Sequence, residues 1–182
     1  MNNAGAAGIV LLAGCALVAG CASLSSGGPQ ASAYLQPTRG NSVSGTVSFT
    51  QTGDKVRMVA EVSGLKPGSE HGFHIHEVGD CSSGDGMSAK GHFNPYGKAH
   101  AHYMSAEHHA GDLPPLKADE QGRAKLDVDL EGFSVAPGPA SIVGRGLIVH
   151  ADPDDFKTQP TGNSGARIAC AVIVGAARPA GY

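Results

Sequence analysis

Short runs in which apolar and polar residues alternate recur through the middle of this chain, and such runs are typical of β-strands with one buried face. Two of them, residues 43–49 and 56–62, flank the polar stretch 50–54, and this arrangement predicts a β-hairpin. Residues 126–130 alternate in the same way and predict a half-exposed strand. Further strand candidates are residues 142–143, 147–149 and 168–174.

Glycine and proline point to the same class of fold. The chain has 27 Gly and 11 Pro but only 5% aromatic residues, a balance that suits short strands joined by turns. Helical periodicity is not evident along the sequence, so we predict an all-β sandwich or barrel. Two segments, residues 77–119 and 151–166, are rich in Gly, Pro, Asp and Ser. Loops of that length are usually functional, and we expect these two to carry the site.

Charge excludes one class of partner. The formal net charge is -3, and the Lys and Arg residues form no basic block. Nucleic-acid binding needs clustered basic residues, so we expect no nucleic-acid partner.

The N-terminus has the features of an export signal. Residues 8–20 are apolar and uncharged, a length that suits a signal-peptide core better than a membrane span. The residues Val-Ala-Gly-Cys that end at Cys21 resemble the bacterial lipoprotein signal, in which the cysteine is lipidated. We therefore expect a signal peptide at residues 1–21, a flexible tether at 22–40 and the folded domain at 41–182. This places the protein in the periplasm or outer membrane, with a membrane as partner through the lipid. Alternatives are a soluble periplasmic protein cleaved beyond Cys21 and an uncleaved anchor, since no Lys or Arg precedes the apolar core.

Beyond the leader, the chain has two cysteines, Cys81 and Cys170. They are compatible with one disulfide in an oxidising compartment, or with two buried thiols in a reducing one.

Histidines are concentrated in one part of the chain, and their spacing suggests metal ligands. On a strand, His74 and His76 project from the same face, while Phe73 and Ile75 face the core. Two imidazoles so placed can bind one metal ion. Further along, three histidines and one carboxylate supply the four donors of a tetrahedral zinc site: His92, His100, His109 and Asp112. The alternative is a His-rich loop that scavenges metal without catalysis.

Five stretches together resemble the copper/zinc superoxide dismutase family. They are residues 72–77, 91–95, 109–113, 146–150 and 162–170. They occur in the family's order, and the likeness covers about residues 41–176. The Gly-Asp-Cys sequence at Cys81 and the leader look like the exported bacterial branch. The resemblance implies a Greek-key β-barrel or sandwich with two long functional loops.

The resemblance also implies a role for individual residues. The copper ligands would be His74, His76, His92 and His150. The zinc ligands would be His92, His100, His109 and Asp112, so that His92 bridges the two ions. Asp154 would link His74 to His100, Arg167 would lie beside the open copper face, and Cys81 and Cys170 would form the disulfide. His71, His102 and His108 match no ligand, and we expect them to be ordinary polar residues.

The implied function is dismutation of superoxide to O₂ and H₂O₂, with one copper that cycles between Cu(II) and Cu(I) and one structural zinc. His92 and Arg167 would be the catalytic residues and superoxide the substrate. A homodimer and a monomer both stay open, because no interface is visible in one sequence. One alternative is a periplasmic copper/zinc-binding module without turnover, which explains the histidines but not Arg167 or Asp154. Another is a structural β-sandwich adhesin, which predicts no stoichiometric copper.

Overall fold

The computed structural model describes residues 27–176 together with Met1. The signal peptide expected at residues 1–21, Cys21 included, lies outside these residues apart from Met1. The described part is an antiparallel β-structure whose one helical element is a short 3-10 turn, η1. The elements are β1 Gln30–Pro37, β2 Ser44–Thr52, β3 Lys55–Ser63, β4 Glu70–His71, β5 Phe73–His76, η1 Met87–Ala89, β6 Leu116–Lys117, β7 Ala124–Leu130, β8 Gly146–His150, β9 Arg167–Val172 and β10 Val174–Gly175.

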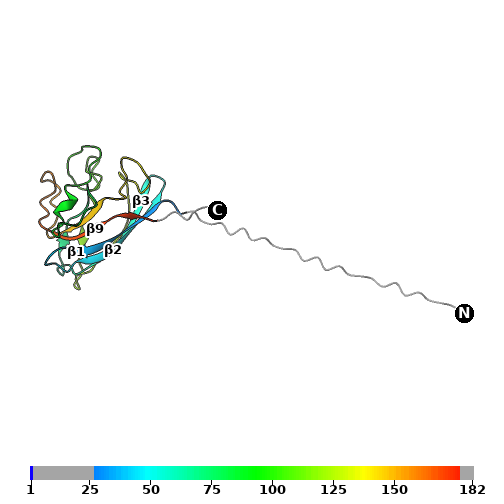
Figure 1. The fold of residues 1–182 in the computed structure, drawn as a ribbon, viewed down its shortest axis with the longest axis horizontal. Helices are drawn as coiled ribbons and strands as arrows, with labels where there is room; N and C mark the ends of the chain where they lie inside the picture. Colours follow the sequence, from blue (N-terminus) through cyan, green and yellow to red (C-terminus); the bar gives the residue numbers. More distant parts are fainter. Residues whose placement is uncertain (2–26, 177–182) are drawn as a thin grey trace.

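The larger sheet has the strand order β5-β8-β9-β1-β2-β3-β7, and β10 also pairs with β1. It curls into a half-barrel (Figure 1). β4 and β6 form a separate two-stranded sheet. This confirms the all-β prediction. In the same described residues, no helix is long and apolar enough to cross a membrane.

Strand β1 corrects the expected tether. Residues 30–37, which we assigned to a flexible segment ending at residue 40, form a strand between β9 and β2. Its inward residues are small or aliphatic, with Ala31, Ala33 and Leu35 at most 4% exposed. The sequence obscured this strand because alanine is a weak strand former and proline flanks the run on both sides. The folded domain therefore begins at least ten residues before residue 41.

The hairpin and the half-exposed strand are confirmed. The ladder between β2 and β3 runs to the pair Thr52 and Lys55, so the turn is tighter than the stretch 50–54 suggested. Gly53 has a φ of 63° in this turn, a conformation that costs glycine little. β7 pairs with β3, and along its length buried or partly buried positions alternate with exposed ones.

Two predictions near the C-terminus change. Residues 142–143 are not a strand: Ile142 fills the core from a loop, where its N–H donates to the Ser134 carbonyl. The run 168–174 is two strands rather than one, because Ile173 leaves the ladder and bonds with Gly144 and Arg145 instead.

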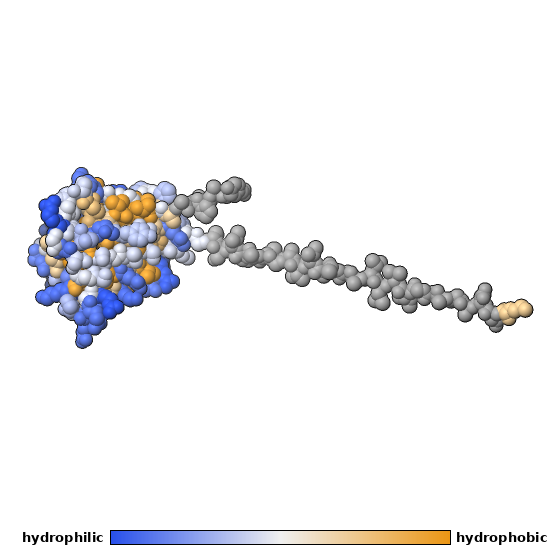
Figure 2. Space-filling view, turned by 60° about the horizontal axis from the view of Figure 1, so that its bottom comes forward, coloured by the Kyte–Doolittle hydropathy of each residue, from blue (hydrophilic) through white to orange (hydrophobic). Residues whose placement is uncertain are grey.

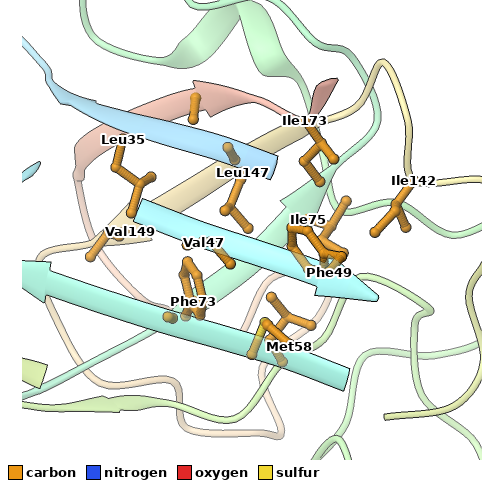
Figure 3. Packing of buried hydrophobic residues seen from close by; sticks show 14 of the residues in the cluster. Leu35, Val47, Phe49, Met58, Phe73, Ile75, Ile142, Leu147, Val149 and Ile173 are labelled. Atoms are coloured by element: carbon orange, nitrogen blue, oxygen red, sulfur yellow. The ribbon is translucent and has the colours of Figure 1, made fainter. Parts of the chain in front are cut away.

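The core lies on the concave side of the curled sheet and collects side chains from strands far apart in sequence (Figure 3). Phe49, Phe73, Ile75 and Leu147 are fully buried there. Burial of each such side chain stabilises the fold by about 1.5–3 kcal/mol. Phe73 and Ile75 thus face the core as expected, and the intervening His74 and His76 are also buried, beneath the long loops. The core therefore fixes the orientation of β5, which fixes the direction of its two histidines.

The loops at residues 77–119 and 151–166 lie side by side at one end of the strands, the green and orange-brown segments of Figure 1. A disulfide joins Cys81 in the first loop to Cys170 on β9, with a Cα–Cα distance of 5.9 Å. The predicted disulfide is confirmed. Elsewhere, hydrophobic side chains reach the surface in scattered groups among hydrophilic ones (Figure 2). Tyr34 and Val174, on the paired strands β1 and β10, are two of the exposed apolar side chains.

Candidate metal centre

Two groups of donor atoms meet beneath the long loops, and one residue belongs to both. The first donor group consists of His74, His76, His92 and His150. The second donor group consists of His92, His100, His109 and Asp112. In each group the donor atoms lie within 4.8 Å of one another, and every member is buried. The structure thus brings together all seven residues that the sequence singled out.

The strands and the first loop together build the first donor group. His74 and His76 come from β5, and His150 ends β8, where the ladder with β9 shifts register. His92 comes from the loop, and an isolated β-bridge sets it opposite His76. The loop is fastened to β5 next to this bridge, because the Ile75 N–H donates to Gly111 and its carbonyl accepts from Phe93. Ile75 therefore buries its side chain while its backbone holds the loop that carries His92.

His92 faces the two groups with its two ring nitrogens. Its Nδ1 lies 2.9 Å from Oδ1 of Asp112 in the second donor group. Its Nε2 is buried without a hydrogen-bond partner among the described residues, and so is Nδ1 of His74. An unpaired buried polar atom costs free energy, so native structures rarely keep one without a purpose. Two unpaired ring nitrogens in the first donor group fit a metal ion as their missing partner.

The second donor group has the dimensions of a zinc site. Oδ1 of Asp112 lies 2.9 Å from Nδ1 of His100 and 3.6 Å from Nδ1 of His109. Nδ1 of His109 lies 3.5 Å from Nδ1 of His92. Donors about 2.0–2.1 Å from a tetrahedral zinc ion are roughly 3.3 Å apart, so these separations fit one ion between them.

Burial and charge favour the protonation state that metal binding requires in four of the donors. Burial lowers the pKa of His92 to about 4. It also holds the pKa of His76 and of His150 well below the usual range, with neighbouring histidines adding to the effect. Burial alone would raise the pKa of Asp112, but hydrogen bonds from His100, His109 and His92 outweigh it and keep the carboxylate ionised.

Asp154, from the second loop, connects the two donor groups. Its Oδ2 lies 2.6 Å from Nε2 of His74, and its Oδ1 lies 2.9 Å from Nε2 of His100. Burial opposes protonation of His100, yet hydrogen bonds to Asp112 and Asp154 raise its pKa to about 9. A carboxylate so placed fixes which ring nitrogen carries the proton, and leaves the other nitrogen of each ring turned toward its donor group.

Comparison with known proteins agrees with this geometry. The family model for copper/zinc superoxide dismutase matches residues 43–173. The chain belongs to this family. It is 44% identical over 137 residues to a Superoxide dismutase [Cu-Zn] of Paramecium bursaria Chlorella virus 1, a match that covers 72% of each chain. It is 39% identical over 148 residues to Superoxide dismutase [Cu-Zn] 2 of Aquifex aeolicus (strain VF5), covering 79% of this chain and 86% of the relative.

A solved structure shows the same fold. The crystal structure of the clock protein EA4 superposes with a TM-score of 0.73 at 37% sequence identity, and covers 80% of this chain and 93% of that one. Family membership confirms the expected enzyme class, superoxide as substrate, and one copper and one zinc as cofactors. The non-catalytic alternatives, the binding module and the adhesin, therefore give way to the superoxide dismutase.

Arg167 lies at the start of β9, next to the first donor group. Its guanidinium donates to the carbonyl of Gly86 at 2.6 Å and to the carbonyl of Lys90. The Lys90 carbonyl also accepts from Nδ1 of His76 at 2.8 Å. One backbone oxygen thus orients both the guanidinium and a histidine of the first donor group. Burial lowers the pKa of Arg167, and nearby Asp85 opposes that shift.

His71 is not the ordinary polar residue that we expected. It is only 3% exposed, and its Nδ1 lies 2.8 Å from the backbone carbonyl of His150, to which it donates. Its Nε2 lies 2.6 Å from the Ser69 hydroxyl. The sequence held a signal for its burial, because residue 71 lies two and four positions before the core residues Phe73 and Ile75, and residues two apart on a strand share a face. His102 and His108 lie outside both donor groups, as expected, and both are partly exposed.

Gly162 permits the contact between Asp154 and His100. It has a φ of 67°, and a Cβ there would lie 1.9 Å from Oδ1 of Asp154 and 2.6 Å from Nε2 of His100. Gly162→Ala must push this carboxylate away, and loss of such a supporting contact typically weakens metal binding roughly 10–100-fold. We expect the variant to lose zinc in dialysis against a chelator, with metal content as the measurement. Gly53→Ala is the matched control, because Gly53 has a φ of 63° with no atom within 4 Å of its Cβ position. Equal zinc content in the two variants would show that this close approach is unimportant.

Proposed function

We propose that the first donor group holds the copper ion of this superoxide dismutase and the second donor group its zinc ion, with His92 a ligand of both. The supporting observation is that the two nitrogens of one buried ring face two different sets of donors. Metal analysis tests the assignment. His100→Ala should lose zinc while copper remains, and His150→Ala should show the reverse preference. Loss of the same metal from both variants would overturn it.

Copper, when bound, supplies the one-electron exchange with superoxide that redox-silent zinc cannot. The reaction converts two superoxide ions and two protons into one O₂ and one H₂O₂, so the protein must also deliver protons. Nε2 of His92 suits this task, because it lies in the first donor group and makes no hydrogen bond to the described residues. Nδ1 stays among the second donor group and keeps the ring in place while Nε2 gains and loses a proton.

Arg167 has the charge and position to draw the substrate anion to this site. Its guanidinium is partly exposed, fixed by two backbone carbonyls, and close enough to His76 and His150 to lower the pKa of both. The protein as a whole is negative, so a local positive potential is needed to attract an anion.

Arg167→Ala is expected to retain both metals and to lower kcat/KM about 10-fold or more, because charge steering raises on-rates by roughly 10–10³. Its activity should also depend less on ionic strength. Superoxide consumption measured over a salt series checks both effects. Arg57→Ala is the control, since Arg57 is exposed on β3 and bonded to Asp127. An Arg167→Ala protein with unchanged rate and salt dependence would contradict this role.

We further propose that the chain is exported as a lipoprotein, with residues 1–21 as signal peptide and lipid on Cys21, and that it resides in the periplasm or outer membrane. The apolar run at 8–20 supports this, and so does the Cys81–Cys170 disulfide, because disulfides persist in oxidising compartments. Mass spectrometry of the mature protein should find diacylglyceryl on Cys21. Cys21→Ala should release the protein from the membrane fraction, whereas Cys15→Ala should not. An unmodified N-terminus beyond residue 21 would refute the lipid anchor. Sedimentation of the purified protein distinguishes a homodimer from a monomer.

A further inference from the structure

The side chain of Gln159 binds the backbone of His100 at two points. Its Nε2 donates to the His100 carbonyl at 2.8 Å, and its Oε1 accepts from the His100 N–H at 2.9 Å. The two residues are 59 positions apart and belong to the two different long loops. The Gln159 amide therefore pairs with His100 as a neighbouring β-strand would.

These two hydrogen bonds matter because the backbone of His100 is not part of a β-ladder. His100 is 2% exposed and lies in a stretch without regular secondary structure. Among the described residues, no backbone group bonds to its N–H or its carbonyl. A buried backbone group without a partner is costly, so Gln159 supplies what a ladder would supply elsewhere.

The turn that presents Gln159 is itself held rigidly. The Asp155 carboxylate accepts from the backbone N–H of Lys157 at 2.9 Å and of Thr158 at 2.8 Å. It also accepts from the Thr158 hydroxyl at 2.6 Å. The Thr158 carbonyl in turn accepts from the Gly162 N–H at 2.7 Å. Gln159 thus reaches across from a closed turn whose backbone is already fixed.

The second loop therefore forms hydrogen bonds with both the ring and the backbone of His100. Asp154 contacts the ring at Nε2, and Gln159 holds the backbone on which that ring is mounted. With the contacts from Asp154 and Gln159 in place, Nδ1 of His100 points toward Asp112 of the second donor group. We propose that Gln159 is a positioning residue for zinc: by fixing the backbone of His100, it slows the release of zinc from the second donor group.

The inference rests on the assignment of His100 to zinc, so the experiment tests the two separately. Gln159→Ala, His100→Ala and Gln121→Ala are loaded with copper and zinc, and the release of each metal into excess chelator is timed. Gln121 is the matched control, because it is an exposed glutamine whose side chain makes no hydrogen bond to the described residues. His100→Ala reports on the assignment alone.

We expect Gln159→Ala to release zinc roughly 10–100-fold faster than Gln121→Ala, the usual effect of losing a contact that orients a metal ligand. Copper release should match the control, because Gln159 is exposed and makes no hydrogen bond to the first donor group. Hydrogen exchange at the His100 amide should be faster in Gln159→Ala.

Two results would overturn the inference. Zinc release from Gln159→Ala at the rate of Gln121→Ala would show that the amide contact does not position the ligand. Equal acceleration of copper and zinc release, with a lower melting temperature, would show that Gln159 stabilises the fold in general. If His100→Ala itself kept zinc, the ligand assignment would fail instead, and the two failures are thereby distinguished.

Discussion

His92→Ala is expected to lower superoxide consumption by roughly 10²–10⁴-fold, the usual contribution of a positioned proton carrier. The substitution removes Nε2 from the first donor group and Nδ1 from the second, so each keeps three of its four members. The variant should therefore still bind metal at both sites, but more weakly. In the variant, the metal affinity of one site should no longer depend on whether the other site is occupied. Activity and metal content measured on the same preparation check this.

The control for this variant is His102→Ala. His102 lies outside both donor groups and packs against Tyr103 and Phe156, with ring centroids 4.4 and 4.6 Å away. It should retain normal activity and one equivalent of each metal. If His92→Ala, loaded with both metals, turned over at the rate of His102→Ala, the shared ring would not be part of the catalytic mechanism.

Cys81→Ser is expected to destabilise the oxidised protein by about 4–5 kcal/mol, because the disulfide closes a loop across a sequence separation of 89 residues. For a domain of this size, that corresponds to a fall in Tm of roughly 10–20 °C. Thermal unfolding under oxidising conditions measures it. The bridge also holds residues 81–86 beside Arg167, whose guanidinium bonds the Gly86 carbonyl, so metal retention should fall as well.

Ser82→Ala, at the exposed neighbouring position, is the control for Cys81→Ser and should unfold like the wild type. Reduced wild-type protein should unfold like Cys81→Ser, which shows that the bond rather than the substitution is responsible. Coincident unfolding curves for Cys81→Ser and oxidised wild type would contradict the prediction.

Alternation in the sequence located most of the sheet, and its failures have physical reasons. β2, β3 and β7 each carry at least two large apolar side chains spaced two residues apart, which makes their buried face recognisable. β1 was missed because two of its three inward residues are alanine. Residues 142–143 were wrongly taken as a strand because one apolar residue, Ile142, fills the core from a loop without joining a ladder.

The candidate site was predictable where residue type itself reveals the chemistry. Histidine and aspartate at family positions led to all seven donors, and the structure places their side chains together. Gln159 has no such signal, since it acts through the backbone of a residue 59 positions away. His71 was undervalued for a similar reason, because its partner is a main-chain carbonyl rather than a metal.

The central place of β1 has a consequence for the order in which the chain folds. β1 pairs with β9 and β10 as well as β2, so Gln36 lies opposite Cys170 and Ala31 opposite Gly175. When the chain is synthesised from its N-terminus, β1 is the first of these strands to appear, and β9 and β10 are the last. The β2–β3 hairpin can form early from local contacts, but the sheet closes only when the last strands arrive. Such a high contact order slows folding, and until closure β1 and β8 each lack a neighbouring strand.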